Sequence, residues 1–203
     1  MNARAFRLSI WLCIPAAAIL IAIWLPNSPN QIRSPGLDSE PTLVSAEFDL
    51  LDHHGNPITE KALQGIPVAL FFGFTHCPDI CPTTLWNLSN YLNTLSQEGF
   101  ALAGFFITVD PLRDTPEVLN GHLANFDGTI TGITGPTDEI EKFLKNWRVY
   151  KKIVPLEDKD YTIDHTASVY LIDAKGILRE TLKYQESHEE SLLKLRRFLA
   201  ANR

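Results

Sequence analysis

The chain has 203 residues, of which 45% are hydrophobic and 21% are charged. This composition is typical of a globular protein and excludes a fibrous or wholly disordered chain. The 24 acidic residues outnumber the 18 basic ones, giving a net charge of −6, and this acidic balance gives no support to a nucleic-acid-binding function.

The first predicted element is an apolar segment at residues 8–25, LSIWLCIPAAAILIAIWL, which contains no charged residue. Its length is sufficient for one transmembrane helix. Arg4 and Arg7 precede it, so residues 1–7 are predicted to be cytoplasmic and the rest of the chain to lie outside. A cleaved signal peptide is the alternative, but no A-x-A site follows the segment. We therefore expect an uncleaved, single-pass anchor in a bacterial-type inner membrane, with the C-terminal domain on the periplasmic side.

Residues 26–42 are rich in proline, serine and asparagine and lack apolar periodicity, so they are predicted to be a tether. Without Arg4 and Arg7, the exported part carries 16 basic and 24 acidic residues, a net charge of −8. Macromolecular partners of this part are therefore expected to present basic patches.

Strands and helices alternate after the tether, beginning with a predicted β-hairpin at residues 46–60. The continuous apolar run at residues 66–74 predicts a buried central strand. Leucines at three- and four-residue spacing predict a helix over residues 82–98, which ends at Gly99.

The second half of the chain continues this alternation. Its predicted elements are a strand at 100–110, a helix capped by Thr115, a strand at 129–134, a helix at 137–149, a long charged loop at 150–165, two strands joined by a turn at 174–176, and an amphipathic helix at 187–203. This order predicts an α/β, thioredoxin-like sandwich over residues 43–203, with an N-terminal β-hairpin and one preceding transmembrane helix.

Two cysteines, Cys77 and Cys81, follow the predicted central strand in the segment FFGFTHCPDICPTTL. A residue before proline disfavours the helical conformation, so Cys81 is expected at the cap position with Pro82 as the first helical residue. The positive end of the helix would lower the thiol pKa there. Outside the cytosol such a pair becomes a disulfide unless it is kept reduced or binds a metal, and the spacing alone does not decide between these.

A metal at this pair would need further ligands, and six histidines are candidates. Two thiolates with one imidazole form a soft, low-coordinate set that suits Cu(I), whereas structural zinc would require a fourth protein ligand. For His53, His54, His76, His122 and His188 we favour surface or hydrogen-bonded roles. His165 precedes a predicted buried strand and would lie near the cysteine loop in a thioredoxin-type sheet, although periodicity alone does not distinguish a ligand from an ordinary histidine.

Four segments occur in order along the chain: GFTHCPDICPTTL, ITVDPLRDTPEVL, GITGPTDEI and DYTIDHTASVYLID. Together they resemble the Sco/SenC family of membrane-anchored copper proteins, across essentially all of residues 43–200. The resemblance implies a thioredoxin-like fold and one copper ion bound by Cys77, Cys81 and His165. It also implies assembly of the binuclear copper centre of cytochrome c oxidase, with the copper-bearing subunit of the oxidase and other copper chaperones or thiol reductants as partners.

Two functions of different classes follow from these residues. The first is a copper metallochaperone, in which oxidation of the cysteine pair to a disulfide would prevent metal loading. The second is a thiol–disulfide oxidoreductase that uses Cys77 and Cys81 without a metal and gives His165 no necessary role, so whether the protein is an enzyme stays open. A peroxidase is a third option, but the CPDICP loop resembles a peroxidatic cysteine site poorly.

Four further charged residues lie in these motifs. Asp79, between the cysteines, has two alternative roles. It would tune the thiols or contact a partner, or it would be a polar loop residue exposed to water. Asp164 would either orient His165 or be a plain loop acid, and we favour the latter. Asp110 and Arg113 are expected to fix a strand-to-helix turn.

Overall fold

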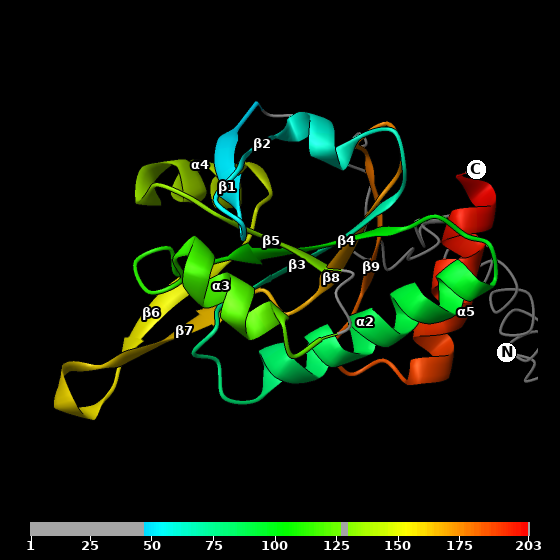
Figure 1. Ribbon diagram of the computed structural model, residues 1–203. Helices are drawn as coiled ribbons and strands as arrows, with labels where there is room; N and C mark the ends of the chain where they lie inside the picture. Colours follow the sequence, from blue (N-terminus) through cyan, green and yellow to red (C-terminus); the bar gives the residue numbers. More distant parts are fainter. Residues whose placement is uncertain (1–46, 127–129, 203) are drawn as a thin grey trace, which may run out of the picture. The chain divides into compact units, whose positions relative to one another are not determined.

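A seven-stranded mixed sheet forms the centre of the protein, whose computed structural model describes residues 47–126 and 130–202 (Figure 1). Its strands are β1 (Asp49–Asp52), β2 (Pro57–Thr59), β3 (Val68–Gly73), β4 (Ala103–Thr108), β5 (Ile130–Thr134), β8 (Val169–Ile172) and β9 (Leu178–Leu182). They lie in the order β2-β1-β5-β4-β3-β8-β9. The strands β3, β4 and β5 are parallel to one another, and the remaining neighbours are antiparallel.

Helices cover both faces of this sheet. They are α2 (Ile80–Gln97), α3 (Pro116–Leu123), α4 (Thr137–Asn146) and α5 (His188–Ala201), with a short 3-10 helix η1 (Glu60–Leu63). Successive residues of β3 point to opposite faces. Phe71 stacks on Phe106, which in turn stacks on His122 of α3, whereas Phe72 packs against Phe143 of α4. The helices α3 and α4 therefore lie on opposite sides, which confirms the predicted thioredoxin-like sandwich.

The predicted central strand is the most deeply buried element. All six residues of β3 are buried, and β3 lies between β4 and β8. A strand covered on both faces needs apolar side chains at every position, which explains the continuous apolar run in the sequence. Each fully buried phenylalanine or leucine of this strand contributes about 1.5–3 kcal/mol relative to an exposed one.

Several local predictions are confirmed. The N-terminal hairpin forms from β1 and β2 in antiparallel register. The helix α2 stops where Gly99 takes a positive φ of 79°, a conformation that glycine adopts without steric cost. The helix α3 begins as expected, because the Thr115 side chain accepts a hydrogen bond from the Val118 N–H and Pro116 is the first helical residue.

The predicted start of α2 is wrong by two residues. The helix begins at Ile80 with Asp79 as the N-cap residue, so Cys81 lies inside the first turn and Pro82 is the third helical residue. A proline is tolerated there because the N–H groups of the first turn have no partner within the helix. The preference of a pre-proline residue for extended backbone is a tendency that this turn overrides.

The predicted long loop at residues 150–165 is also wrong. The segment forms a two-stranded antiparallel sheet of β6 (Lys151–Pro155) and β7 (Tyr161–His165), with a 3-10 turn η2 (Glu157–Lys159) at its tip. Figure 1 shows this β6–β7 hairpin projecting from the main sheet. Only Ile163 is buried in these two strands, so the sequence lacks the apolar alternation that would reveal them.

The predicted transmembrane segment at residues 8–25 and the tether at residues 26–42 lie outside the described residues. Within the part of the chain that the structure describes, no helix is long and apolar enough to cross a membrane.

Register explains why distant segments meet at one edge of the sheet. The strand β3 ends at Gly73 and leads into the cysteine loop. The antiparallel strand β8 begins opposite that end, since Val169 pairs with Phe71. The residues just before Val169, including His165, therefore arrive beside the loop that follows β3.

Candidate metal centre

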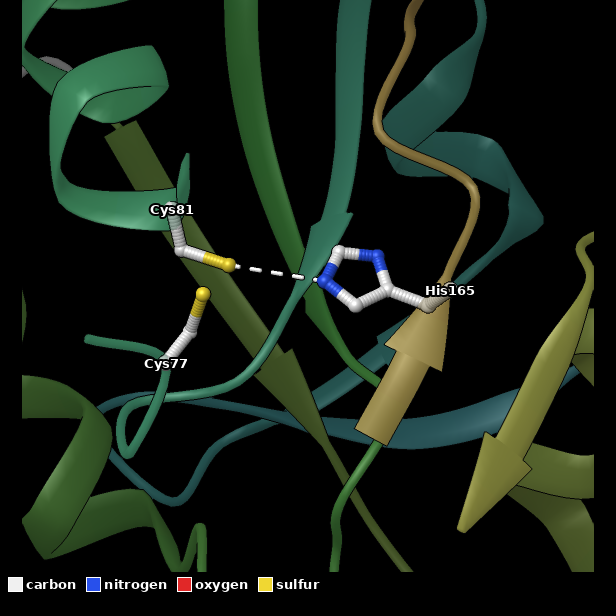
Figure 2. Close-up of side chains that lie close together, drawn as sticks. All are labelled: Cys77, Cys81 and His165. Atoms are coloured by element: carbon white, nitrogen blue, oxygen red, sulfur yellow. Dashed lines mark hydrogen bonds between the residues drawn. The ribbon is translucent and has the colours of Figure 1, made fainter. Parts of the chain in front are cut away.

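Three side chains converge where β3 ends: Cys77, Cys81 and His165. Their ligand atoms all lie within 4.8 Å of one another. The Cys81 sulfur is 3.5 Å from the imidazole Nε2 of His165. Figure 2 shows both sulfurs and this nitrogen directed into the same space, although the three residues come from a loop, a helix and a separate hairpin. The structure thus brings together the three residues that were predicted to bind a metal ion.

Cys81 is held in the core. Its side chain is buried in the first turn of α2, against the end of β3. Gly73 makes this approach possible, because a Cβ at that position would lie 2.9 Å from the Cys81 sulfur and 2.6 Å from Cε2 of Phe106. The sulfur therefore occupies the volume that any larger residue at Gly73 would fill.

Cys77 is half-buried and lies on the loop between β3 and α2. Its N–H donates to the Phe74 carbonyl at 3.2 Å. Asp114 holds the start of this loop, since its carboxylate accepts from the Thr75 N–H at 3.1 Å and from the Thr75 hydroxyl at 2.5 Å. The same carboxylate accepts from the Thr108 hydroxyl at 2.6 Å and is completely buried. This role of Asp114 was not predicted from the sequence. The signal for it is a second acid beside Asp110 in the ITVDPLRDTP segment, at a position that the fold buries.

His165 is the last residue of β7 and is half-buried. Its Nδ1 lies 3.0 Å from the Thr166 carbonyl, which can only accept a hydrogen bond, so Nδ1 carries the proton. The lone pair of Nε2 is then available on the side that faces the sulfurs. The orienting acceptor is thus a backbone carbonyl, while Asp164 is exposed, as the simpler expectation for that residue had it.

The two thiols are not equivalent in their protonation. A hydrogen bond from the Cys81 thiol lowers the pKa of Cys77 to about 3, against the opposing effect of burial, and the backbone N–H groups of Cys81 and Asp79 also favour the thiolate. The same hydrogen bond to Cys77, together with burial, raises the pKa of Cys81. The pair therefore shares one proton: Cys77 is the thiolate and Cys81 keeps its hydrogen.

Four of the other five histidines are exposed or hydrogen-bonded, as expected, whereas Nε2 of the half-buried His122 has no hydrogen-bond partner among the described residues. His53 accepts from the Gly132 N–H at 3.0 Å, His54 and His76 are exposed, His122 stacks on Phe106, and His188 packs against Tyr91. In the residues that the structure describes, none of these five belongs to the cluster of possible metal ligands, whose histidine is His165. Asp79, between the cysteines, is exposed and makes no capping hydrogen bond through its side chain.

Asp110 and Arg113, which were expected to fix the strand-to-helix turn, form an ion pair within it. Arg113 also reaches the β6–β7 hairpin, where it donates to the Asp160 carboxylate and to the Tyr161 carbonyl. These long-range contacts could not be predicted because the hairpin itself was not expected.

Comparisons with known proteins show which chains this protein is similar to. The mitochondrial protein SCO1 of Saccharomyces cerevisiae is 45% identical over 136 residues, which cover 66% of this chain and 46% of that protein. The structure of Bradyrhizobium japonicum ScoI with copper bound is 41% identical, with a TM-score of 0.70, over 76% of this chain and 99% of that one. The structure of yeast Sco1 with copper bound is 39% identical, with a TM-score of 0.70, over 75% of this chain and 86% of that one.

The chain spans about half the length of the yeast SCO1 and SCO2 proteins that it matches. Residues 37–200 match the sequence profile of SCO1/SenC, which includes the strands, helices and loops that carry the three converging side chains. The match covers most of the chain and confirms the resemblance found in the four motifs. The chain belongs to the SCO1/SenC family.

Proposed function

We propose that this protein is a copper metallochaperone that binds one copper ion through Cys77, Cys81 and His165. The observation that carries the proposal is the convergence of two sulfurs and one imidazole nitrogen within 4.8 Å. This donor set fits copper, because thiolate ligands favour Cu(I) and imidazole serves both copper oxidation states.

The number of donors also supports copper over zinc. A structural zinc site has four protein ligands, whereas the cluster among residues 47–126 and 130–202 offers one atom from each of three residues. Two relatives, from Bradyrhizobium japonicum and yeast, have been solved with copper bound. Their similarity to this chain extends over three quarters of its length, which supports the same cargo here.

The protein's own groups prepare the site for a soft cation. Cys77 supplies a thiolate that is half-exposed, so an incoming copper ion meets it first. Cys81 then releases its proton as it binds, and the fixed Nδ1–H of His165 leaves Nε2 as the third donor. A two-electron oxidant would instead join the sulfurs in a disulfide, with release of the one proton held by Cys81, and would remove two of the three ligands.

The partner and location extend this proposal. We assign the copper to the binuclear centre of cytochrome c oxidase, with the copper-bearing subunit as acceptor and other copper chaperones or thiol reductants upstream. Family membership supports this role. The uncharged segment at residues 8–25 and the preceding arginines support a membrane anchor with the domain on the periplasmic side.

Copper quantification on the purified, fully reduced protein tests the proposal. We expect one copper per chain for the wild type, loss of stable binding in Cys77→Ser and Cys81→Ser, and measurably weaker binding through the two remaining sulfurs in His165→Ala. The matched control is His54→Ala, which removes an exposed histidine outside the cluster and should bind copper like the wild type. An undiminished affinity in His165→Ala would rule out the third ligand, and a wild type without affinity for copper would refute the function.

The asymmetry of the two thiols favours a second candidate function, reduction of disulfides in the partner. The Cys77 thiolate would attack a partner disulfide, form a mixed disulfide and release one partner thiolate. Cys81 would then lose its proton and attack the Cys77 sulfur, which forms the intramolecular disulfide and releases the second partner thiolate. Full reductase activity in His165→Ala with none in Cys77→Ser would favour this function over copper delivery.

A further inference from the structure

Arg113 connects the loop after β4 to the start of β7. Its Nη1 donates to the Asp160 carboxylate at 3.1 Å and to the Tyr161 carbonyl at 3.1 Å, while its Nε pairs with the buried carboxylate of Asp110. The Tyr161 hydroxyl donates to the other oxygen of Asp110 at 2.9 Å. Two residues of the main domain thus hold the first residues of the strand that ends at His165.

The guanidinium also belongs to a row of ring contacts that runs to the metal site. Its central carbon is 3.8 Å from the centroid of the Tyr161 ring and 5.8 Å from that of Phe74. The Phe74 ring lies edge-on to the His165 imidazole, with centroids 5.8 Å apart. Nη2 of Arg113 is buried without a hydrogen-bond partner among the described residues, which fits a guanidinium packed over rings. Arg113 therefore touches both the strand that carries His165 and the ring against which His165 packs.

The hairpin needs such an anchor. It forms its own two-stranded sheet, separate from the seven-stranded one, and an isolated two-stranded hairpin is at best marginally stable in water. His165 pairs with Lys151 across this sheet, so the backbone that carries the imidazole moves with the hairpin. The cysteine loop, by contrast, is held by Asp114 through bonds that do not involve Arg113.

We propose that Arg113 is the positioning residue for His165, and that it sets copper affinity by fixing the β6–β7 hairpin against the metal site without touching the metal. The inference rests on the proposed copper function. It predicts that the loss of Arg113 acts through the nitrogen ligand alone and leaves the two sulfur ligands in place.

Lysine cannot replace Arg113 in this role although it keeps the positive charge. A guanidinium presents several N–H donors in a rigid plane and stacks flat on rings, whereas an ammonium group is a compact, strongly hydrated point charge. Arg113→Lys therefore removes the geometry of the anchor and retains its charge. The matched control is Arg179→Lys, because Arg179 pairs in the same way with the buried Asp173, at the opposite end of β8 from His165.

The first experiment measures Cu(I) affinity of the full chain by competition with a chelator. We expect Arg113→Lys to weaken binding about 10- to 100-fold, the usual effect of losing a group that orients a ligand. Arg179→Lys should bind like the wild type. In a His165→Ala background, Arg113→Lys should cause no further loss, because no nitrogen ligand remains to be positioned.

A metal-free experiment tests the anchor directly. Amide hydrogen exchange of the apo protein should be faster at Tyr161–His165 in Arg113→Lys than in the wild type, and unchanged there in Arg179→Lys. Both variants should keep wild-type exchange in β3, which shows that each has folded. This measurement does not depend on copper and therefore separates hairpin positioning from metal chemistry.

Three outcomes would overturn the inference: wild-type affinity in Arg113→Lys, an equal further loss in the His165→Ala background, or unchanged exchange in β7. The proposed function fails in a different way, since a wild-type protein without copper affinity would refute it whatever the exchange data show. If the wild type binds copper and His165→Ala weakens it while Arg113→Lys does not, only the role of Arg113 is lost.

Discussion

Gly73→Ala tests how closely the core is packed around one sulfur. An added Cβ would lie 2.6 Å from Cε2 of Phe106 and 2.9 Å from the sulfur of Cys81, and both distances are shorter than real contacts of a Cβ atom. Phe106 cannot yield easily, because it is fully buried and stacked on Phe71. Overpacking of this kind costs about 1–3 kcal/mol. For a chain of this size, each kcal/mol lowers the melting temperature by about 2–4 °C, which gives a decrease of about 2–12 °C.

Thermal denaturation of the reduced apo protein, followed by circular dichroism, measures this effect. The matched control is Gly121→Ala in α3, where a Cβ meets nothing within 4 Å and removal of glycine from a helix should stabilise by about 0.5–1 kcal/mol. Copper affinity should also fall in Gly73→Ala, because the Cys81 sulfur must move, and stay unchanged in Gly121→Ala. A Gly73→Ala protein that melts at or above the wild-type temperature would show that the close approach of the sulfur does not limit this position.

Three further predictions concern the same loop. Copper affinity should rise about tenfold per pH unit between about pH 6.5 and 8.5. The pKa of Cys77 near 3 leaves Cys77 a thiolate throughout this range, whereas the raised pKa of Cys81 means that copper displaces one proton from Cys81. A competition titration at several pH values measures this slope, and an affinity independent of pH would contradict the prediction. Limiting iodoacetamide at neutral pH should alkylate Cys77 before Cys81, because Cys77 is a partly exposed thiolate and Cys81 is a buried thiol. Peptide mass spectrometry measures the order of alkylation, and modification of Cys81 first would contradict the prediction. Asp114→Ala should lower the free energy of unfolding in urea by about 1–3 kcal/mol, because it removes the acceptor of the buried Thr108 hydroxyl and of the part-buried Thr75 N–H. Equal stability of the variant and the wild type would show that other groups replace Asp114.

The sequence predicts well those parts of the fold in which one residue pattern corresponds to one environment. The apolar run of β3 predicts a central strand because the strand is buried on both faces. The cap at Thr115 and the stop at Gly99 are recognisable because helix ends need particular side chains or backbone angles. The association of Cys77 and Cys81 also follows from their short spacing in the sequence, which joins the loop after β3 to the first turn of α2.

The hairpin could not be predicted for the opposite reason. In β6 and β7 most residues are at least partly exposed, so apolar and polar residues do not alternate along these strands. A charged strand without this alternation cannot be distinguished from a charged loop by its sequence. The position of His165 depends on how this hairpin packs, which is a long-range property. The four family motifs supplied that information, because they nominate His165 without any knowledge of the strand that carries it.

The two halves of the site differ in how firmly the fold holds them. The Cys81 sulfur cannot move without repacking Phe106 and the end of β3, which belong to the most buried part of the domain. His165 is held mainly through the hairpin and its side-chain contacts at Arg113, which are worth on the order of a few kcal/mol. Local opening at that cost is far more frequent than global unfolding. Under the proposed function, a site divided in this way would give up its nitrogen ligand while both sulfurs still hold the metal, which opens a coordination position for a ligand of the acceptor.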